Sequence, residues 1–246
     1  MYVKVKNLSL TYYINTFNQS YLRKNIVNKL LGKSDNNQLK KINALSQINL
    51  DLKVGDRLGI IGPNGSGKST LIKCLSGIIY PDEDSLIEIE GKYLPIIEPT
   101  SLAEMTDTVE NNIMLIGLLL GFEKKYILEK KREILDFSEL AKYIHSSYSI
   151  LSTGMKLKLI FSIVFLLGSD IFIIDEFLTT GDERFREKSY SHLLEETKNN
   201  ITVICSHERS TIKSFCNKIL VLNKGNQEYF GEVDAGFKVY DKFIKD

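Results

Sequence analysis

The stretch that most constrains the fold is residues 62–70, which read Gly-Pro-Asn-Gly-Ser-Gly-Lys-Ser-Thr. An apolar run, residues 58–61, precedes it, and a run of helix formers, residues 71–75, follows it. The spacing matches the phosphate-loop pattern G-x-x-x-x-G-K-S/T, which joins a strand to a helix. Chance would produce this match in on the order of one per cent of chains of this size. The sequence therefore predicts a site that binds a nucleoside triphosphate.

The chemistry of a polyphosphate explains why these residue types stand at these positions. Gly65 and Gly67 carry no Cβ, so successive backbone N–H groups can curl around phosphate oxygens. The following helix adds the positive end of its dipole. Lys68 can reach the β- and γ-phosphates as a catalytic residue, and the Ser69 hydroxyl can bind Mg²⁺. The predicted nucleotide-binding residues of the loop are Gly62, Pro63, Asn64, Gly65, Ser66, Gly67, Lys68, Ser69 and Thr70.

Composition excludes several other classes of protein. The chain has 246 residues, 43% hydrophobic and 26% charged, which is enough for one substantial α/β core. A net charge of +1 disfavours an electrostatic nucleic-acid binder. Cys74, Cys205 and Cys216 are an odd number in apolar surroundings and are predicted to be reduced packing residues of a cytosolic protein. We expect no signal peptide, and the longest uncharged stretches, about ten residues, are too short to span a bilayer.

Strand patterns alternate with helical ones, which favours an α/β fold with a mostly parallel, covered sheet. Strands are predicted at residues 2–6, 48–54, 56–61, 85–90, 93–97, 171–174 and 201–205, and a hairpin at 218–231 that turns at 224–226. Helices are predicted at residues 183–197 and at the end of the chain, and residues from about 108 to 168 are helical in pattern. We predict a single domain, residues 1–246, with a phosphate-loop core at about 1–98 and 168–246 and a helical subdomain at about 99–167.

A basic insert, residues 15–43, separates the first two predicted strands. It carries six basic residues against one acid. Its apolar residues recur at helical spacing, which predicts a short amphipathic helix with Tyr21, Leu22, Ile26, Leu30 and Leu31 on one face. Two interpretations remain: an excursion packed on its own domain with a solvated basic face, or a helix docked on a membrane surface or a partner.

Two acids, Asp175 and Glu176, follow the buried strand predicted at residues 171–174. A parallel strand delivers its last residues to the carboxyl edge of the sheet, where ligands bind. Asp175 would there hold Mg²⁺ through Ser69 or water, and Glu176 would orient and polarise the attacking water. Alone, such a run could be a strand that meets a solvated turn, but its place after Lys68 and a helical block favours the catalytic role.

Two further elements complete the predicted site. Ser152 and Gly154 stand just before a helical run, residues 156–167, so they can form an anion site, although a serine N-cap alone has the same pattern. His207 ends a predicted strand and would lie beside the phosphates. A lone histidine is more often structural, and only its position favours a role in catalysis.

These four elements, in this order, resemble the nucleotide-binding subunit of an ATP-binding-cassette (ABC) transporter over essentially the whole chain. The resemblance implies a phosphate-loop NTPase core, whose mostly parallel sheet has an antiparallel portion, and a helical subdomain. Residues 151–155 are similar to the family signature, usually Leu-Ser-Gly-Gly-Gln, but depart from it at Thr153 and Met155. By this likeness Ser152, Thr153 and Gly154 would contact the ATP.

The resemblance also implies roles for residues outside these motifs. Glu98 stands where the family has a glutamine, and Asp182 resembles the aspartate of the loop after the second acidic motif. His207 resembles the switch histidine. Tyr12 is the best candidate for the aromatic residue that stacks on adenine, with Tyr13 as the alternative.

The departures, together with the basic insert, resemble the branch of the family that exports polysaccharides such as O-antigen, capsule or teichoic acid. The resemblance then implies a homodimeric ATPase that uses ATP and Mg²⁺ on the cytoplasmic face of the membrane. Its partners would be integral membrane permease subunits, which handle the lipid-linked glycan, and it would bind no nucleic acid. Some members of this branch carry a C-terminal carbohydrate-binding domain, for which we expect this chain to be too short.

Other functions remain possible from the sequence. The chain could serve an ABC transporter of another substrate, or be a soluble ABC ATPase that acts on ribosomes or DNA. The latter usually carry two cassettes or a long coiled coil, which this chain lacks. A phosphate-loop kinase or nucleotide switch would have no use for the signature residues or His207.

Overall fold

The computed structural model describes residues 1–14, 40–96, 102–175, 183–196, 198–206 and 208–244. Its strands are β1 (Tyr2–Ile14), β2 (Lys40–Lys53), β3 (Arg57–Ile61), β4 (Leu86–Glu90), β5 (Tyr93–Ile96), β6 (Ile171–Asp175), β7 (Ile201–Cys205), β8 (Lys218–Asn223) and β9 (Asn226–Gly231). Its helices are α2 (Lys68–Leu75), α3 (Val109–Leu119), α4 (Lys124–Ser138), α5 (Thr153–Leu167), α6 (Glu183–Glu196), α7 (Arg209–Phe215) and α8 (Val233–Ile244). Two 3₁₀ turns, η2 (Ala141–Tyr143) and η3 (Tyr148–Ile150), lie between α4 and α5.

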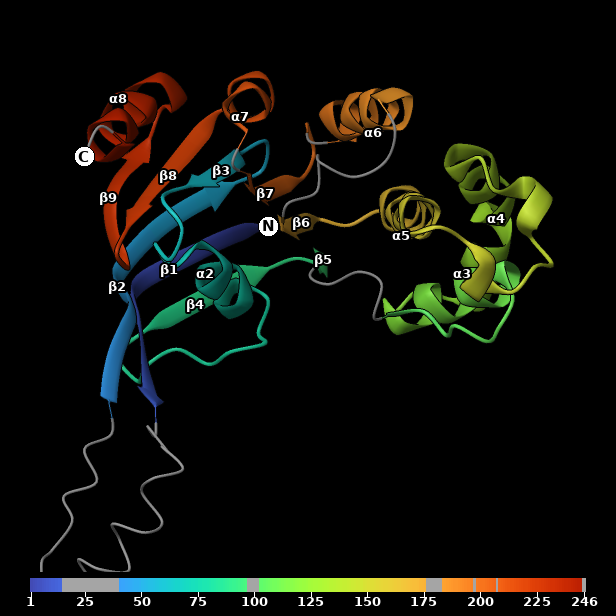
Figure 1. The fold of residues 1–246 in the computed structure, drawn as a ribbon, viewed down its shortest axis with the longest axis horizontal. Helices are drawn as coiled ribbons and strands as arrows, with labels where there is room; N and C mark the ends of the chain where they lie inside the picture. The colour runs from blue at the N-terminus through green and yellow to red at the C-terminus, as the bar shows by residue number, and fades with distance from the viewer. Residues whose placement is uncertain (15–39, 97–101, 176–182, 197, 207, 245–246) are drawn as a thin grey trace, which may run out of the picture.

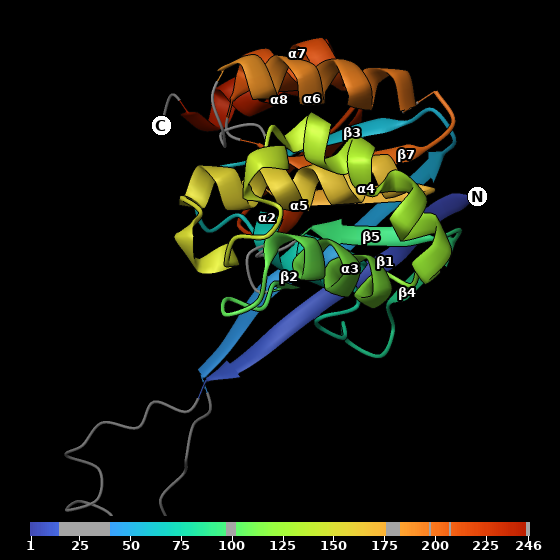
Figure 2. The same cartoon turned by 90° about the vertical axis from the view of Figure 1, so that its right-hand side faces the viewer.

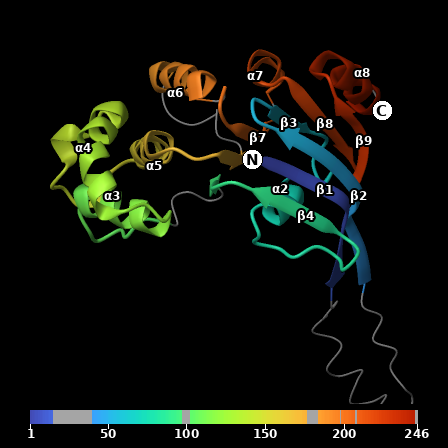
Figure 3. The same cartoon turned by 180° about the vertical axis from the view of Figure 1, so that it is seen from behind.

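The described strands form one sheet in the order β4-β1-β2-β9-β8-β3-β7-β6-β5. The strands from β8 to β5 are parallel to their neighbours, whereas β1 pairs antiparallel with β2 and β4, and β8 with β9. Figures 1 and 3 show α2 enclosed between the antiparallel strands and the parallel ones. The predicted α/β fold, a mainly parallel sheet with an antiparallel portion, is confirmed.

The central strands serve two cores, because successive side chains of a strand point to opposite faces. In β6, Ile171 and Ile173 pack with α2 and the antiparallel strands. Phe172 and Ile174 pack on the other face, where α5, α6, α7 and α8 lie. All four side chains are almost completely buried. Burial on both faces explains why this strand reads as a continuous apolar run rather than an alternating one.

The helices α3, α4 and α5 pack against one another to one side of the sheet (Figures 1 and 2). Thr108 caps α3, since its Oγ1 accepts a hydrogen bond from the Asn111 backbone N–H at 3.1 Å. A Cβ on Gly117 would lie 2.7 Å from the Ile127 side chain, so this glycine lets α3 and α4 approach closely. The helical pattern predicted between residues 108 and 168 is therefore confirmed.

No helix within the described residues is both long enough and apolar enough to cross a lipid bilayer.

The first two strands are longer than predicted. β1 runs on to Ile14 and β2 begins at Lys40, so residues 40–43, predicted as part of the basic insert, lie in a strand. The remainder of the insert, residues 15–39, lies outside the described residues. The full length of these strands was not predicted because bulges interrupt the alternation of their side chains. The pairing of β1 with β2 has three register shifts, and Asn7 and Gln47 both have a positive φ angle of 51°.

The structure also contains α7, a helix that the sequence did not predict. It has seven residues and is rich in serine and threonine, so its apolar periodicity is short. The Glu208 carboxylate stabilises its first turn by accepting hydrogen bonds from the hydroxyls of Ser210 and Thr211, each at 2.9 Å. The predicted hairpin, in contrast, is confirmed, and its tight turn holds Lys224 and Gly225 at φ angles of 47° and 83°.

Candidate nucleotide-binding site

The phosphate loop joins β3 to α2 and depends on glycine at two positions of left-handed backbone. Gly65 has φ 76°, and Gly67, the N-cap of α2, has φ 103°. A Cβ on Gly67 would lie 2.7 Å from the Ala44 carbonyl oxygen, whereas a Cβ on Gly65 would meet nothing within 4 Å. Gly67 is therefore required both for its conformation and for the close approach of β2.

Lys68 begins α2 and is only 7% exposed. Its ammonium group donates hydrogen bonds to the carbonyl oxygens of Gly62 and Pro63, at 2.9 and 3.0 Å. An ammonium group has three N–H donors, so these two contacts leave one that can reach a phosphate oxygen. The loop thus holds a positive charge at its own mouth.

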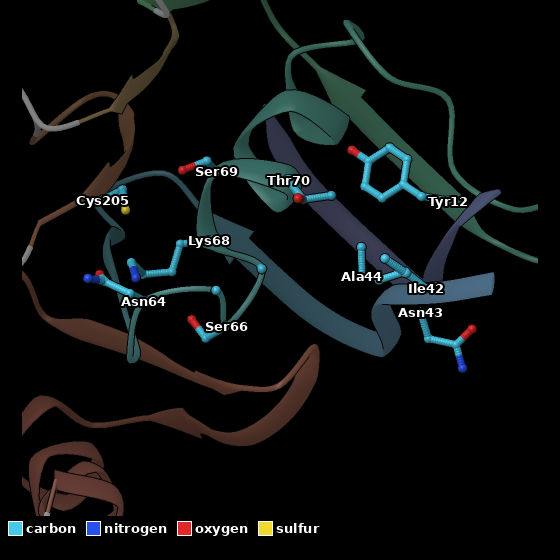
Figure 4. A pocket seen from close by; sticks show the side chains of 12 residues that line it. Tyr12, Ile42, Asn43, Ala44, Asn64, Ser66, Lys68, Ser69, Thr70 and Cys205 are labelled. Carbon is cyan, nitrogen blue, oxygen red and sulfur yellow. The ribbon is translucent and has the colours of Figure 1, made fainter. Parts of the chain in front are cut away.

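A pocket of about 510 Å³ opens beside the loop. Tyr12 lies at one end of it, with Lys68, Ser69 and Cys205 toward the other (Figure 4). Its walls come from four stretches of chain that are far apart in sequence. The lining residues are Tyr12, Ile42, Asn43, Ala44, Asn64, Gly65, Ser66, Gly67, Lys68, Ser69, Thr70 and Cys205. An aromatic ring at one end and a phosphate loop at the other fit the two ends of a nucleotide.

The hairpin turn between β8 and β9 contacts the phosphate loop and supports it. The backbone N–H of Gly225 donates to the carbonyl oxygen of Ser66 at 3.0 Å. A Cβ on Gly225 would lie 2.8 Å from the Ala44 carbonyl oxygen, so the turn also contacts β2. Ser66 itself is 2% exposed, and its hydroxyl has no hydrogen-bond partner among the described residues. The loop is therefore fixed by segments that lie far from it in sequence.

Sequence reasoning missed several residues of this site. Ile42, Asn43 and Ala44 of β2 line the pocket, although the sequence assigned the first two to the insert. Gly225 was predicted only as part of a turn. Cys205 was also missed as a pocket residue, although the sequence held a signal for it. It ends a buried strand, β7, which pairs with the strand that ends in Asp175.

Register places Asp175 at the same sheet edge as the phosphate loop. It is the last residue of β6 and pairs with Cys205 of β7, which in turn pairs with Ile60 of β3. The parallel strands β3, β7 and β6 therefore deliver the loop, Cys205 and Asp175 to one carboxyl edge of the sheet, and for Asp175 this is the edge that the sequence predicted. The other site residues predicted near this edge lie outside the described residues: Glu98, Glu176, Asp182 and His207.

The signature segment forms the N-terminus of α5. The Ser152 hydroxyl oxygen caps this helix by accepting a hydrogen bond from the Met155 backbone N–H at 3.3 Å. Ser152 and Thr153 are exposed, and a Cβ on Gly154 would meet nothing within 4 Å. None of these three residues lines the pocket of its own chain. The structure thus presents an open helix N-terminus apart from the phosphate loop.

The three cysteines are buried and form no disulfide, which agrees with the predicted packing role. Burial, with a smaller contribution from the charge of Asp82, raises the pKa of the Cys74 thiol in α2 to about 11. Burial raises the pKa of Cys216 to about 12. Both groups are therefore protonated thiols at neutral pH, and neither is an activated nucleophile.

Comparison with known proteins places this geometry in a family. A family model described as "ABC transporter" matches residues 45–179. A teichoic acids export ATP-binding protein, TagH, of Staphylococcus haemolyticus is 33% identical over 245 residues, which cover 99% of this chain and 89% of that protein. TagH of Bacillus anthracis is 35% identical over 203 residues, 82% of this chain. The chain spans only 37% of the Bacillus protein.

Solved structures share the fold. The ATP-binding cassette MJ0796, in a dimeric post-hydrolysis state bound to ADP and Pi, superposes with a TM-score of 0.72 over 94% of this chain and 98% of its own. The sequence identity is 20%, so this likeness concerns the fold alone.

Proposed function

Because this chain belongs to the ABC transporter family, we propose that it is an ATP-hydrolysing subunit that powers export of a lipid-linked polysaccharide across the cytoplasmic membrane. The polymer would be of the O-antigen, capsule or teichoic acid type. The observation that carries the ATPase part is the phosphate loop, with Lys68 held at the mouth of a pocket of nucleotide size. The export part is supported by the relatives, which are named for teichoic acid export.

In this proposal the pocket binds ATP along its length. Tyr12 stacks on the adenine, since it lines the pocket, whereas Tyr13 does not line it and is 63% exposed. The loop amides and the N-terminus of α2 bind the phosphates. Lys68 donates its remaining N–H to a β- or γ-phosphate oxygen.

A Mg²⁺ ion suits the oxygen groups available at the phosphate end. Ser69 lines the pocket at the start of α2, and Asp175 ends β6 at the same sheet edge. A hydroxyl and a carboxylate are ligands that Mg²⁺ prefers in phosphate sites. When bound, the ion neutralises charge that develops on the phosphate oxygens.

Hydrolysis needs a group that prepares the attacking water. We assign this role to Glu176, which directly follows Asp175 in the chain, and a contact with the γ-phosphate to His207. Asp182 and Glu98 complete the proposed set by family resemblance. Together these residues would orient water in line with the bond that breaks.

The site is proposed to be completed by a second copy of the chain. Ser152, Thr153 and Gly154 lie outside their own pocket on an open helix N-terminus, which favours an anion. In a homodimer this N-terminus would cover the ATP of the other copy. ATP then stabilises the closed dimer, and loss of phosphate lets the copies separate.

The membrane partner is proposed to dock on the lobe of α3, α4 and α5. Leu115, Leu118 and Leu119 stand at helical spacing on α3 and are 36%, 48% and 61% exposed. Such an apolar stripe suits a protein partner. Of the predicted basic insert, residues 15–43, the part outside β2, residues 15–39, would lie near the membrane, and the subunit would be peripheral on the cytoplasmic face. The glycan itself would be handled by the permease subunits.

Lys68→Ala tests this function. The variant loses the charge that binds the phosphates, so ATPase activity should fall to background, and polymer should accumulate inside cells and disappear from their surface. Lys73→Ala, an exchange in the last turn of the same helix, is the matched control and should leave both readouts unchanged. Normal surface polymer in a Lys68 variant with confirmed loss of ATPase activity would contradict the export function and leave the ATPase assignment in place.

A further inference from the structure

We propose that Asp82 is a positioning residue for the nucleotide base: it fixes Thr11, and through Thr11 the strand that presents Tyr12 to the pocket. The inference rests on the proposed function, in which Tyr12 stacks on the adenine of ATP. Asp82 lies in the loop between α2 and β4 and does not line the pocket itself.

The loop that carries Asp82 continues the sheet where β4 ends. β1 pairs with β4 only as far as Lys6, opposite Leu86. Beyond that point the Asp82 backbone N–H donates to the Ser9 carbonyl oxygen at 2.8 Å. The Ser85 hydroxyl oxygen accepts from the Ser9 backbone N–H at 3.0 Å. The loop therefore takes the place of a paired strand along this edge of β1.

The Asp82 carboxylate binds Thr11 twice. Its Oδ1 accepts from the Thr11 backbone N–H at 3.2 Å, and its Oδ2 accepts from the Thr11 hydroxyl at 3.0 Å. Hydrogen bonds to a charged group are stronger than neutral ones. Thr11 directly precedes Tyr12, so this pair of contacts lies one residue from the base end of the pocket.

Past Thr11, the described part of β1 pairs in the sheet with β2 alone. Tyr12 pairs with Ile42, and the ribbon continues as far as Ile14 and Lys40. A ribbon of two strands without further packing is marginally stable. Asp82 is thus the last contact on the outer edge of β1, within the described residues, before the ring that lines the pocket.

The same loop is anchored to the helix of the phosphate loop. The backbone N–H of Ile78 donates to the Lys73 carbonyl oxygen of α2 at 2.9 Å. Asp82 also lies close enough to α2 for its charge to help raise the pKa of Cys74. Since α2 begins at Lys68, Asp82 connects the base end of the pocket to its phosphate end. Its loss should loosen the position of Tyr12 and leave the phosphate loop intact.

Two ligands distinguish a loss of adenine binding from a general loss of structure at the site. ATP uses both ends of the pocket, whereas inorganic tripolyphosphate uses only the phosphate end. Asp82→Ala should weaken ATP binding about tenfold, which corresponds to partial loss of base–aromatic stacking, and change tripolyphosphate binding less than about twofold. Calorimetric titration of the full chain with each ligand measures both dissociation constants. A thermal melt of each variant reports whether it is folded.

Two further variants identify the contact responsible. Asp82→Asn keeps an oxygen for the Thr11 N–H and an N–H₂ for its hydroxyl oxygen, so it should retain most of the parent's ATP affinity, although the charge that strengthens these bonds is gone. Thr11→Val keeps the backbone contact with Asp82 but removes the hydroxyl contact with it, together with a longer one of 3.4 Å to Asn43 of β2, and should weaken ATP binding about two- to threefold. Glu83→Ala, an exposed neighbour, is the matched control and should change neither ligand.

The outcomes are distinguishable from failure of the proposed function. The positioning role would be overturned if Asp82→Ala weakened the binding of ATP and of tripolyphosphate equally. It would also be overturned if that variant weakened the binding of neither ligand. If that variant did not fold, unchanged ATP affinity in Thr11→Val would overturn it instead. If the parent protein bound ATP no more tightly than tripolyphosphate, the adenosine would contribute nothing to affinity. That result would contradict the proposed nucleotide site itself, and with it the role of Asp82.

Discussion

At the scale of single residues, the phosphate loop solvates the charge that it presents. Lys68 is almost buried, and burial of an uncompensated ammonium is costly. The carbonyl oxygens of Gly62 and Pro63 compensate it within the loop itself. The ammonium group is thus held in place by carbonyl groups of the same loop. A phosphate oxygen can reach its remaining N–H without breaking either of these hydrogen bonds.

Glu176→Gln tests the residue proposed to prepare the water. The amide keeps the size of the side chain but loses the charge that polarises water, so hydrolysis should slow roughly a hundredfold. ATP binding should persist, because the phosphate loop is untouched, and the ATP-bound dimer should persist on gel filtration. Steady-state ATPase assays and equilibrium ATP binding measure the two effects. Glu129→Gln on α4 serves as the control, and parent-like hydrolysis in the Glu176 variant would assign the base to another residue.

At the scale of elements, two basic residues of the short helix α7 hold it against α8. Arg209, the first residue of α7, forms an ion pair with Asp241 of α8. Its guanidinium also lies over the rings of Phe237 and Tyr240, 5.1 and 5.5 Å from their centres. A second ion pair, 3.6 Å long, joins Lys213 to Asp234. These contacts fix the helix that begins just after residue 207, where the sequence places the switch histidine.

Arg209→Ala should lower the free energy of unfolding by about 1 kcal/mol, mostly through the lost cation–π contacts, because a half-exposed ion pair contributes little. Urea denaturation monitored by circular dichroism measures the change. Lys238→Ala, an exposed lysine on α8, should change stability by less than about 0.5 kcal/mol. Equal effects of the two substitutions would show that Arg209 does not hold the two helices together.

At the scale of the whole molecule, the residues that we propose to form one ATP site lie on different surfaces. The phosphate loop opens into the pocket at the carboxyl edge of β3, whereas Ser152 begins α5 in the helical lobe and does not line that pocket. The open surface over Gly154 leaves room for a phosphate or a second chain. This separation is what a site shared between two copies requires.

Ser152→Arg tests the shared site. The new side chain would put bulk at the helix N-terminus where the phosphate of the other copy is proposed to dock, so dimerisation with ATP and hydrolysis should both be lost. Equilibrium titration of the monomer should give the parent affinity for ATP, because the pocket of the same chain is unchanged. Ser191→Arg on the exposed side of α6 is the control. Loss of ATP affinity in the monomer would place Ser152 in its own chain's site and contradict the dimer.

The sequence by itself determined those features whose causes are local. The phosphate loop was predictable because glycines at set positions, a lysine and a hydroxyl act over nine adjacent residues. The strands β3, β6 and β7 were predictable because burial on both faces produces continuous apolar runs. The position of Asp175 followed from the same rule, since a buried parallel strand delivers its last residue to the ligand-binding edge.

Only the tertiary structure decided what depends on strand order and on contacts between distant residues. Bulges in β1 shift the alternation, so pattern alone could not tell whether Tyr12 or Tyr13 faces the pocket. The contacts of Ala44 and Gly225 with the phosphate loop depend on β2 and β9 being neighbours in the sheet. The bond from Asp82 to Thr11 likewise joins segments 71 residues apart. Such contacts leave no periodic signal in the sequence. Each joins one pair of residues that are far apart in the chain, and only the complete fold brings the two together.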